Sequence, residues 1–306
     1  MKRVLVTGLT GFVGRHLYEL FKENGIEIIA IVRQPDPSMK GVKWVVGDLV
    51  SDLNHIKEGL KPYIGTLDTL YHLAWKGVNA AVKNEFDIQS DNIFIANNIV
   101  EISKYVECDR FINSGTVAEY VCEDGLINDK CVPTPMDLYG VMKVASRNII
   151  ATECNKYGIN MIGTIICSTY GEYRSDDNVV SYTIKTLLQN KAPEFGLLNQ
   201  MWDFLYVKDV AKALFLIGEK GIYGKTYGIG SGRYKRLNEY IYDIHKFVGN
   251  NTEIKIGALK EKYKKVLNSC VDCYQIQKDT GFYPEYSFEE GIKRTIAFYK
   301  EEVNNG

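Results

Sequence analysis

The stretch Met1–Gly14 reads MKRVLVTGLTGFVG and decides how the N-terminal half of the chain can fold. Its apolar run Val4–Val6 is typical of a short parallel strand that is buried on both faces. Three glycines follow, Gly8, Gly11 and Gly14, and they lead directly into an amphipathic helical pattern. At such a strand–turn–helix junction, glycines permit a tight turn and let an anionic group reach the backbone at the helix N-terminus. The stretch therefore predicts a phosphate-binding turn.

Short β-branched runs alternate with helical patterns through the first half of the chain, and this order predicts a doubly wound parallel α/β sheet that binds a dinucleotide. We expect strands near Val4–Thr7, Glu27–Val32, Lys43–Val46, Thr69–His72, Arg110–Ser114 and Asn160–Cys167, and helices near Phe12–Asn24, Ile88–Tyr105, Leu138–Tyr157, Glu239–Val248 and Phe288–Val303. The expected domains are a dinucleotide-binding domain of residues 1–170, to which 203–230 return, and a smaller substrate-binding α/β cap of residues 171–202 and 231–306.

The composition excludes several classes of partner. The 306 residues have a net charge of -1, which gives no electrostatic reason to expect nucleic acid as a partner. No apolar run approaches the length of a membrane helix, and the N-terminal run is too short for a signal peptide, so we expect a cytoplasmic protein without a membrane partner. The seven cysteines are scattered, and Cys270 and Cys273 are expected to be two partly buried thiols rather than metal ligands. No metal site is predicted.

The residue after the second strand bears on the choice of cofactor. In dinucleotide-binding folds an acidic residue at this position accepts a hydrogen bond from the adenosine ribose 2′-hydroxyl. Here the position is Arg33, and no acid follows until Asp36. An arginine can pair with a 2′-phosphate. We therefore expect NADP, with NAD as the alternative if Arg33 is only a solvated surface charge.

The motif Tyr139-x-x-x-Lys143 lies on a predicted helix, and the spacing of four places both side chains on one face. At about 4 Å and an effective dielectric constant near 20, an ammonium favours the phenolate by about 4 kcal/mol, or about three pKa units. We therefore expect the pKa of Tyr139 to fall toward neutrality, where a general acid works best. Upstream, Ser114 and Thr116 follow another strand and offer hydroxyl groups that could hold a carbonyl oxygen.

Together with these features, further segments resemble the extended short-chain dehydrogenase/reductase family, also called the NAD-dependent epimerase/dehydratase family. The resemblance covers nearly the whole chain. Besides the glycine turn and the tyrosine–lysine pair, it is carried by Gly47–Leu49 (GDL), His72–Ala74 (HLA), Trp202–Val210 (WDFLYVKDV), Lys225–Gly232 (KTYGIGSG) and Gly281–Pro284 (GFYP).

The resemblance implies roles for individual residues. The catalytic residues would be Thr116, Tyr139 and Lys143, with Ser114 as the alternative to Thr116. The residues implied in cofactor binding are Gly8, Thr10, Gly11, Phe12, Val13, Gly14, Arg33, Asp48, Leu49, Leu73, Ala74, Trp75, Asn92, Ser114, Tyr139 and Lys143. It also implies a homodimer that pairs the two central helices. Their apolar residues would exceed what one sheet face can cover, among them Ile95, Ile99, Ile102, Val144 and Ile149.

Departures from the family pattern restrict the function. Dehydratases of the family carry two acidic or hydroxyl-bearing residues after the catalytic threonine, but this chain has Val117 and Ala118 there, so a 4,6-dehydratase is disfavoured. Contacts to the substrate pyrophosphate are altered, because Trp202 and Ile165 replace arginines and Ser168 replaces an asparagine. Arg174 and Arg233 are candidate substitutes, and either could instead be a surface charge.

The segments 71–77 and 114–120 are most similar to nucleotide-sugar 4-reductases of surface-polysaccharide pathways. This implies NADPH-dependent reduction of the C4 ketone of a nucleotide-linked 4-keto-6-deoxyhexose or heptose. One alternative is an NAD-dependent nucleotide-sugar 4-epimerase that uses the same three residues. Another is a protein that binds NADP without catalysis, and the intact pair of Tyr139 and Lys143 counts against it. The nucleotide, the sugar and the configuration at C4 stay open.

Overall fold

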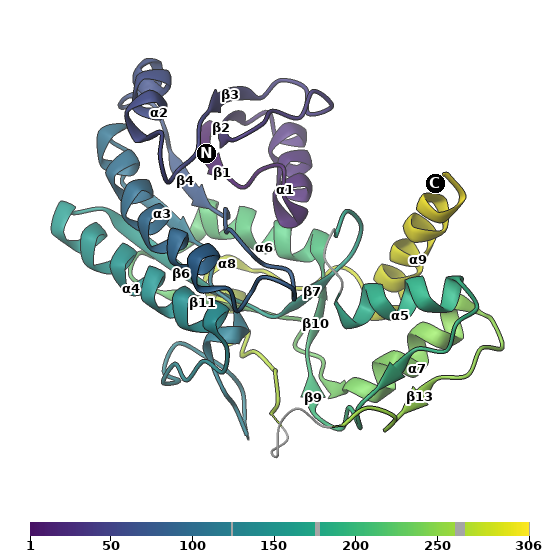
Figure 1. Cartoon of the computed structure of the whole chain (residues 1–306). Coiled ribbons are helices and arrows are strands. Elements are labelled where there is room, and N and C mark those ends of the chain that lie inside the picture. Colours follow the sequence, from purple (N-terminus) through teal and green to yellow (C-terminus); the bar gives the residue numbers. More distant parts are fainter. Residues whose placement is uncertain (124, 175–177, 261–266, 306) are drawn as a thin grey trace.

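A seven-stranded parallel sheet organises the computed structural model, which describes residues 1–123, 125–174, 178–260 and 267–305 (Figure 1). The strand order is β11-β6-β5-β4-β1-β2-β3. The strands are β1 (Arg3–Thr7), β2 (Glu27–Val32), β3 (Lys43–Val46), β4 (Thr69–His72), β5 (Arg110–Asn113), β6 (Asn160–Ile166) and β11 (Thr226–Ile229). The order reverses direction between β1 and β4, so the predicted doubly wound α/β fold is confirmed.

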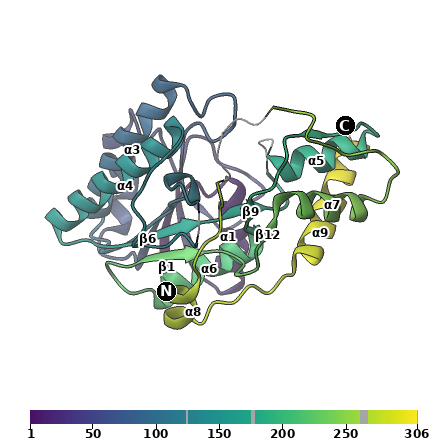
Figure 2. The same cartoon turned by 90° about the horizontal axis from the view of Figure 1, so that it is seen from below.

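Helices cover both faces of the sheet (Figures 1 and 2). One face carries α1 (Phe12–Glu23), α6 (Val207–Lys220) and α8 (Tyr274–Thr280), and the other carries α2 (Leu53–Leu60), α3 (Phe86–Tyr105) and α4 (Leu138–Tyr157). Side chains alternate along β1, so Val4 and Val6 enter the first core and Leu5 enters the second. Burial on both faces explains why this strand is a continuous apolar run.

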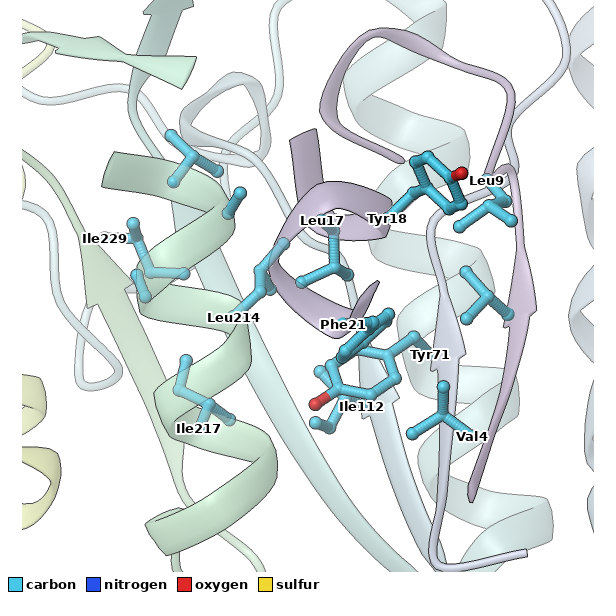
Figure 3. Close-up of a cluster of buried hydrophobic side chains, with 14 of the residues drawn as sticks. Val4, Leu9, Leu17, Tyr18, Phe21, Tyr71, Ile112, Leu214, Ile217 and Ile229 are labelled. Atoms are coloured by element: carbon cyan, nitrogen blue, oxygen red, sulfur yellow. The ribbon is translucent and has the colours of Figure 1, made fainter. Parts of the chain in front are cut away.

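The core under α1 fixes the helix that begins at the glycine turn. Leu17 and Phe21 of α1 lie against Leu214 and Ile217 of α6, with Tyr71 of β4 beneath them (Figure 3). Each of these side chains is fully buried, and such burial contributes roughly 1.5–3 kcal/mol per large apolar residue. This packing holds the N-terminus of α1 at the carboxyl ends of the strands.

Two glycines of the turn are required by close backbone contacts. Gly8 has φ +76°, and a Cβ there would lie 2.7 Å from the backbone nitrogen of Ala74, just after β4. A Cβ on Gly14 would overlap the carbonyl oxygens of Gly8 and Leu9. Glycine at these two positions therefore lets α1 and the end of β4 approach the turn.

A smaller unit packs beside the sheet, around α5 (Val179–Leu188), α7 (Leu237–Val248) and α9 (Phe288–Asn305) (Figure 1). Short strands join the two parts and complete this unit, in the pairs β7 (Ser168–Tyr170) with β10 (Phe204–Tyr206), β9 (Met201–Trp202) with β12 (Lys235–Arg236), and β8 (Glu194–Phe195) with β13 (Lys255–Ile256). The expected cap also contains residues 175–177 and 261–266, which lie outside the described residues.

The expected elements match the structure closely, and the differences lie mainly in elements that the pattern did not predict. The six expected strands are present with bounds that agree within one residue, while α2, α5, α6, α8 and β11 were not predicted. Within the described chain, no helix is long and apolar enough to cross a membrane.

Three of the five apolar residues offered in support of a dimer need correction, whereas Val144 and Ile149 on α4 are half-buried. Ile95, Ile99 and Ile102 are at most 7% exposed, because they pack inside the chain between α3 and the sheet. The large apolar side chains that remain exposed on α3 and α4 include Phe94 and Val141, at 60% and 44%.

Candidate active site

A large cavity of about 1550 Å³ runs along the carboxyl ends of the strands and into the smaller unit. Every residue expected to be catalytic or to bind the cofactor lines it, with one exception. These lining residues are Gly8, Thr10, Gly11, Phe12, Val13, Gly14, Arg33, Asp48, Leu49, Leu73, Ala74, Trp75, Ser114, Thr116, Tyr139 and Lys143. The fold thus brings together segments that are up to 135 residues apart in the chain (143 minus 8).

The exception is Asn92, which lies behind the cavity wall. It is 1% exposed, and its side chain accepts a hydrogen bond from the Lys76 backbone nitrogen (2.9 Å) and donates one to the Lys76 carbonyl oxygen (3.0 Å). Asn92 therefore fixes the loop after β4 from behind. Its expected direct contact with a cofactor has no support in this geometry.

The start of α1 offers backbone N–H groups to an anion. Gly11 is the N-cap of this helix, Phe12 and Val13 line the cavity, and the first turn contains no acidic residue. The partial positive charge at the helix N-terminus therefore faces the cavity without a competing carboxylate.

At the end of β2, the exposed Arg33 lines the cavity beside Asp36 and Arg15. One oxygen of Asp36 accepts a hydrogen bond from Arg15 (2.6 Å), and the other accepts from the backbone and the hydroxyl of Ser38 (2.9 and 2.6 Å). These hydrogen bonds, those from Ser38 first, lower the pKa of Asp36 to about 2. Asp36 is thus already occupied at both oxygens, whereas Arg33 is open to a ligand.

The histidine of the HLA segment has a structural role. His72 is buried, and its Nδ1 lies 2.8 Å from the hydroxyl of Thr7 at the end of β1. Burial lowers its pKa to about 3, so the ring is neutral. The pair links the ends of β1 and β4, next to the glycine turn.

The helix α4 carries Tyr139 and Lys143 into the cavity. It begins after Asp137, which caps it by accepting a hydrogen bond from the Gly140 backbone nitrogen (2.9 Å). The hydroxyl of Thr116 lies close enough to the phenol of Tyr139 to lower its pKa. Lys143 is 8% exposed and donates a hydrogen bond to the Ser114 carbonyl oxygen (3.0 Å). A hydroxyl, a phenol and an ammonium therefore meet at one point of the wall, and of the two candidate hydroxyls it is that of Thr116 that contacts the phenol.

The expected fall in the pKa of Tyr139 is wrong for this structure. Burial raises its pKa to about 12, and the nearby hydroxyl of Thr116 opposes this only in part. The reason is that the ammonium of Lys143 lies 6.0 Å from the ring centroid of Tyr139 and is itself desolvated, which lowers its own pKa to about 8. Loss of solvation outweighs the attraction. Tyr139 is consequently protonated at neutral pH, and its raised pKa makes it a weaker acid than a phenol in water.

Glu119 and Arg147 support the loop that carries Thr116, and the sequence analysis did not select them. Glu119 is 1% exposed and accepts a hydrogen bond from the Thr116 backbone nitrogen (2.9 Å), while the Thr116 hydroxyl accepts one from Ala118. Arg147 lies 3.2 Å from the second oxygen of Glu119. The spacing Thr116-x-x-Glu119 is that of a capping box, so the sequence did contain a signal for it.

Of the two candidate substitute arginines, only Arg174 lines the cavity, whereas Arg233 is exposed away from it. Arg174 donates a hydrogen bond to the Thr169 carbonyl oxygen (3.0 Å) and lies over the ring of Phe12. Trp202 also lines the cavity, where the family pattern has an arginine.

The cysteine pair is placed away from the cavity. Cys270 and Cys273 are both buried, and burial raises their pKa values to about 11 and about 12. They are therefore thiols with little thiolate at neutral pH. No group of three metal-ligating side chains occurs among the residues that the structure describes.

A doubly wound sheet, a helix N-terminus that faces a large cavity and a Thr–Tyr–Lys cluster define the class of the protein: an oxidoreductase of the short-chain dehydrogenase/reductase type. Residues 4–230 match the model of the NAD dependent epimerase/dehydratase family, and the chain belongs to this family, whose enzymes modify nucleotide sugars.

Relatives with known activities fall into several branches. The chain is 24% identical over 98% of its length to an Arabidopsis thaliana trifunctional UDP-glucose 4,6-dehydratase/UDP-4-keto-6-deoxy-D-glucose 3,5-epimerase/UDP-4-keto-L-rhamnose-reductase, of which it spans only 47%. In structure it is similar to the UDP-glucose 4-epimerase of Thermotoga maritima, with a TM-score of 0.87 and 22% identity over 98% of this chain and 99% of that one. It is also similar to the dTDP-glucose 4,6-dehydratase of Streptomyces venezuelae, solved with NAD, with a TM-score of 0.87 and 19% identity over 99% and 98%.

The pair of Glu119 and Arg147 gives a test of the site's support. Arg147→Met should lower the free energy of unfolding by about 3 kcal/mol in urea titrations at neutral pH, because it leaves a buried carboxylate without its partner. Burial already raises the pKa of Glu119, so in the variant Glu119 should take up a proton on folding. The loss should therefore shrink below pH 4.5, where the unfolded state is protonated as well.

The control is Lys156→Met, which removes the exposed partner of Glu153 on the same helix. That change should cost less than about 0.5 kcal/mol. Equal losses in the two variants, or a loss in Arg147→Met that does not vary with pH, would contradict the role given to Glu119 and Arg147.

Proposed function

We propose that the chain is an NADPH-dependent reductase of the C4 ketone of a nucleotide-linked 4-keto-6-deoxy sugar. The observation that carries this proposal is the set of groups around Tyr139. Thr116, Tyr139 and Lys143 offer one proton donor and its supports, while the adjoining Val117 and Ala118, which also line the cavity, offer no acid or base. A site with one proton donor suits the addition of a hydride and a proton to a ketone.

The cavity has room for both a cofactor and a substrate. Sites for one small molecule commonly enclose about 300–1,000 Å³, and this cavity encloses about 1550 Å³. The part next to α1 and β2 would hold the dinucleotide, and the part that reaches Asn199, Gln200 and Trp202 would hold the sugar nucleotide. The smaller unit around α5, α7 and α9 would thus bind substrate, while α8, which also falls within the expected cap of residues 171–202 and 231–306, packs on the sheet.

The residues of the chain divide the reaction between them. NADPH supplies the hydride when it is bound. Tyr139 donates its proton to the C4 oxygen, and Thr116, whose hydroxyl lies close to the phenol of Tyr139, holds that oxygen. The ammonium of Lys143 would favour the developing phenolate and hydrogen-bond the nicotinamide ribose. A tyrosine that is protonated at neutral pH is ready to begin a reduction, whereas an epimerase must first remove a proton from the substrate.

The apolar lining supports a 6-deoxy sugar. Val78, Val121 and Met136 come from the loops after β4 and η2 (Val117–Glu119) and line the same cavity as Tyr139. Such side chains can contact a methyl group at C6. The resemblance to reductases of surface-polysaccharide pathways supports a cytoplasmic role in the supply of deoxysugars.

NADP is the proposed cofactor, with NAD as the alternative. Arg33 is open at the end of β2, and both oxygens of Asp36 are engaged by Arg15 and Ser38, so the 2′-position of the ribose would meet a cation rather than a free carboxylate. The NAD found with the Streptomyces venezuelae dehydratase is the reason to keep the alternative.

The reductase is tested by loss of absorbance at 340 nm when the purified protein is incubated with NADPH and a panel of 4-keto-6-deoxy nucleotide sugars. Tyr139→Phe should leave NADPH affinity nearly intact and lower kcat by about 10²–10⁴-fold, since the phenol acts mainly in the transition state. Lys143→Ala should lower kcat and cofactor affinity together. Thr116→Val should have a smaller effect than Tyr139→Phe, and Ser114→Ala the smallest.

Other outcomes would separate the alternatives. Near-normal reduction by Tyr139→Phe would contradict the assigned proton donor, and a larger effect of Ser114→Ala than of Thr116→Val would exchange the roles of these two hydroxyls. Interconversion of C4 epimers by protein that carries tightly bound NAD, without net oxidation of NADPH, would establish the epimerase instead.

The cofactor preference is tested by titrating the protein with NADPH and NADH. Arg33→Ala should weaken NADPH binding by about tenfold to a hundredfold, the loss of one charge-assisted contact, and should leave NADH binding unchanged. Lys43→Ala is the control, because Lys43 is an exposed cation on the neighbouring strand β3 and does not line the cavity. Equal loss of affinity for the two cofactors in Arg33→Ala would remove the argument for NADP.

We also propose a homodimer through α3 and α4. The exposed Phe94 and Val141 support it, in place of the isoleucines that turned out to be buried. A closed twofold interface would cover such side chains. Light scattering should show a dimer at micromolar concentration and a monomer for Phe94→Asp, while a monomeric native chain would exclude the proposed interface.

A further inference from the structure

The indole of Trp75 lies between the two ionisable catalytic groups. Its ring centroid is 4.1 Å from the Nζ of Lys143, so the ammonium sits over the aromatic face. Its ring also meets that of Tyr139 edge to face, at 5.7 Å and an interplanar angle of 84°. Trp75 follows the HLA segment at the end of β4 and comes from a different element than α4, which carries the two catalytic residues.

The orientation of the indole is itself fixed. Its N–H donates a hydrogen bond to the side-chain oxygen of Gln89 (3.2 Å), a residue of α3 that is fully buried. The amide nitrogen of Gln89 donates in turn to the carbonyl oxygen of Gly77 (2.6 Å), which holds the loop that carries Trp75. The ring is therefore anchored at its polar edge, and its face is held toward Lys143.

Lys143 needs such a contact because little else stabilises its charge. Within the described residues its ammonium donates one hydrogen bond, to the neutral carbonyl oxygen of Ser114, and it forms no ion pair. A desolvated ammonium over a tryptophan face is one of the stronger cation–π arrangements. The negative face of the indole thus stabilises the ammonium of Lys143. A carboxylate in its place would compete with the phenolate of Tyr139 for that ammonium.

We propose that Trp75 is a positioning residue of the active site, which keeps Lys143 charged and aimed at Tyr139. The catalytic part of this inference rests on the proposed function. The contact between Trp75 and Lys143 does not, because it is present in the chain without substrate or cofactor. Burial lowers the pKa of Lys143 to about 8, so near neutral pH a modest loss of stabilisation would deprotonate it.

The other charged and titratable groups near Lys143 are not sufficient by themselves to stabilise its ammonium form. Glu119 on η2 raises the pKa of Lys143, but it lies 3.2 Å from Arg147, which is one turn further along α4. His72 on β4 is neutral, and Tyr139 on α4 is protonated at neutral pH. On the side of the loop and α3, Lys76 and Asp91 pair with each other. The aromatic face is therefore the added support.

The first test needs no substrate. Trp44→Phe with Trp202→Phe leaves Trp75 as the sole tryptophan of the chain, so its fluorescence reports on its own surroundings. Because a neighbouring ammonium quenches indole emission, the intensity should titrate with a midpoint near pH 8, below the onset of ordinary tyrosine ionisation at about 10. The same protein with Lys143→Met should show no such titration. An unchanged titration in Lys143→Met, or none in the parent, would overturn the proposal whatever the substrate.

The second test uses the pH profile of kcat/KM for NADPH-dependent reduction. Activity that requires the Lys143 ammonium falls as the pH rises through its pKa, so Trp75→Leu should move this fall to lower pH by about one unit. Trp75→Phe retains an aromatic face and should move it less. Trp44→Leu is the matched control, because Trp44 is a half-buried tryptophan on β3 that does not line the cavity, and it should not move the profile.

The two tests separate the possible failures. A uniform loss of activity in Trp75→Leu, with the profile at its original pH, would show that the indole only fills space. No reductase activity in the unaltered protein would contradict the proposed function, while the fluorescence titration would still decide whether Trp75 supports Lys143.

Discussion

The close approach of three backbone segments at Gly8 is the constraint on which the site depends. The turn after β1, the start of α1 and the end of β4 meet there with no room for a side chain. This contact places the N-terminus of α1 at the cavity and brings Leu73–Trp75 beside it. The buried pair of Thr7 and His72 holds the two strand ends in register at the same point. A change in this turn would therefore move the cofactor site and the wall that carries Trp75 together.

Beyond the turn at Gly8, buried polar residues from several elements hold the loops that carry the proposed catalytic groups. Asn92 and Gln89 of α3 hold the loop after β4, and Glu119 holds the backbone of Thr116. Each is almost fully buried and makes its hydrogen bonds to backbone or to one defined partner. Buried polar side chains of this kind are costly unless they are paired, so they restrict the loops to one arrangement. These residues therefore fix the positions of the proposed catalytic side chains.

The parts of the structure that followed from sequence are those with a local physical signal. The strands of the sheet could be predicted because burial on both faces requires continuous apolar runs, as in Glu27–Val32. The glycine turn and the pair of Tyr139 and Lys143 could be found because their spacing is set within one turn or helix. The amphipathic helix α6 was not predicted, because it begins at Val207 directly after β10 and its N-cap, Tyr206, provides no side-chain capping hydrogen bond that would mark its start.

The properties that could not be predicted depend on contacts between distant segments. The raised pKa of Tyr139 follows from how much solvent the folded chain removes, and no spacing along α4 contains that information. The same holds for the burial of Ile95 and Ile99, which depends on the depth of the groove between α3 and the sheet. The support of Lys143 is of this kind too, because its partners are a carbonyl group after β5 and an aromatic ring after β4.

The proposed direction of the chemistry, reduction of a ketone, agrees with this distribution of charge. A phenol that keeps its proton and an ammonium held by neutral groups form a site whose net charge is positive before the reaction. Negative charge that develops on a ketone oxygen is stabilised there, and the low polarity of the buried surroundings strengthens that effect. A free carboxylate beside Tyr139 would weaken it, and of the two described carboxylates that act on Tyr139, Glu119 is engaged by Arg147 and Asp137 by Lys83. The positive charge of Lys143 therefore favours the build-up of negative charge on a ketone oxygen, in agreement with the absence of further acids and bases at Val117 and Ala118.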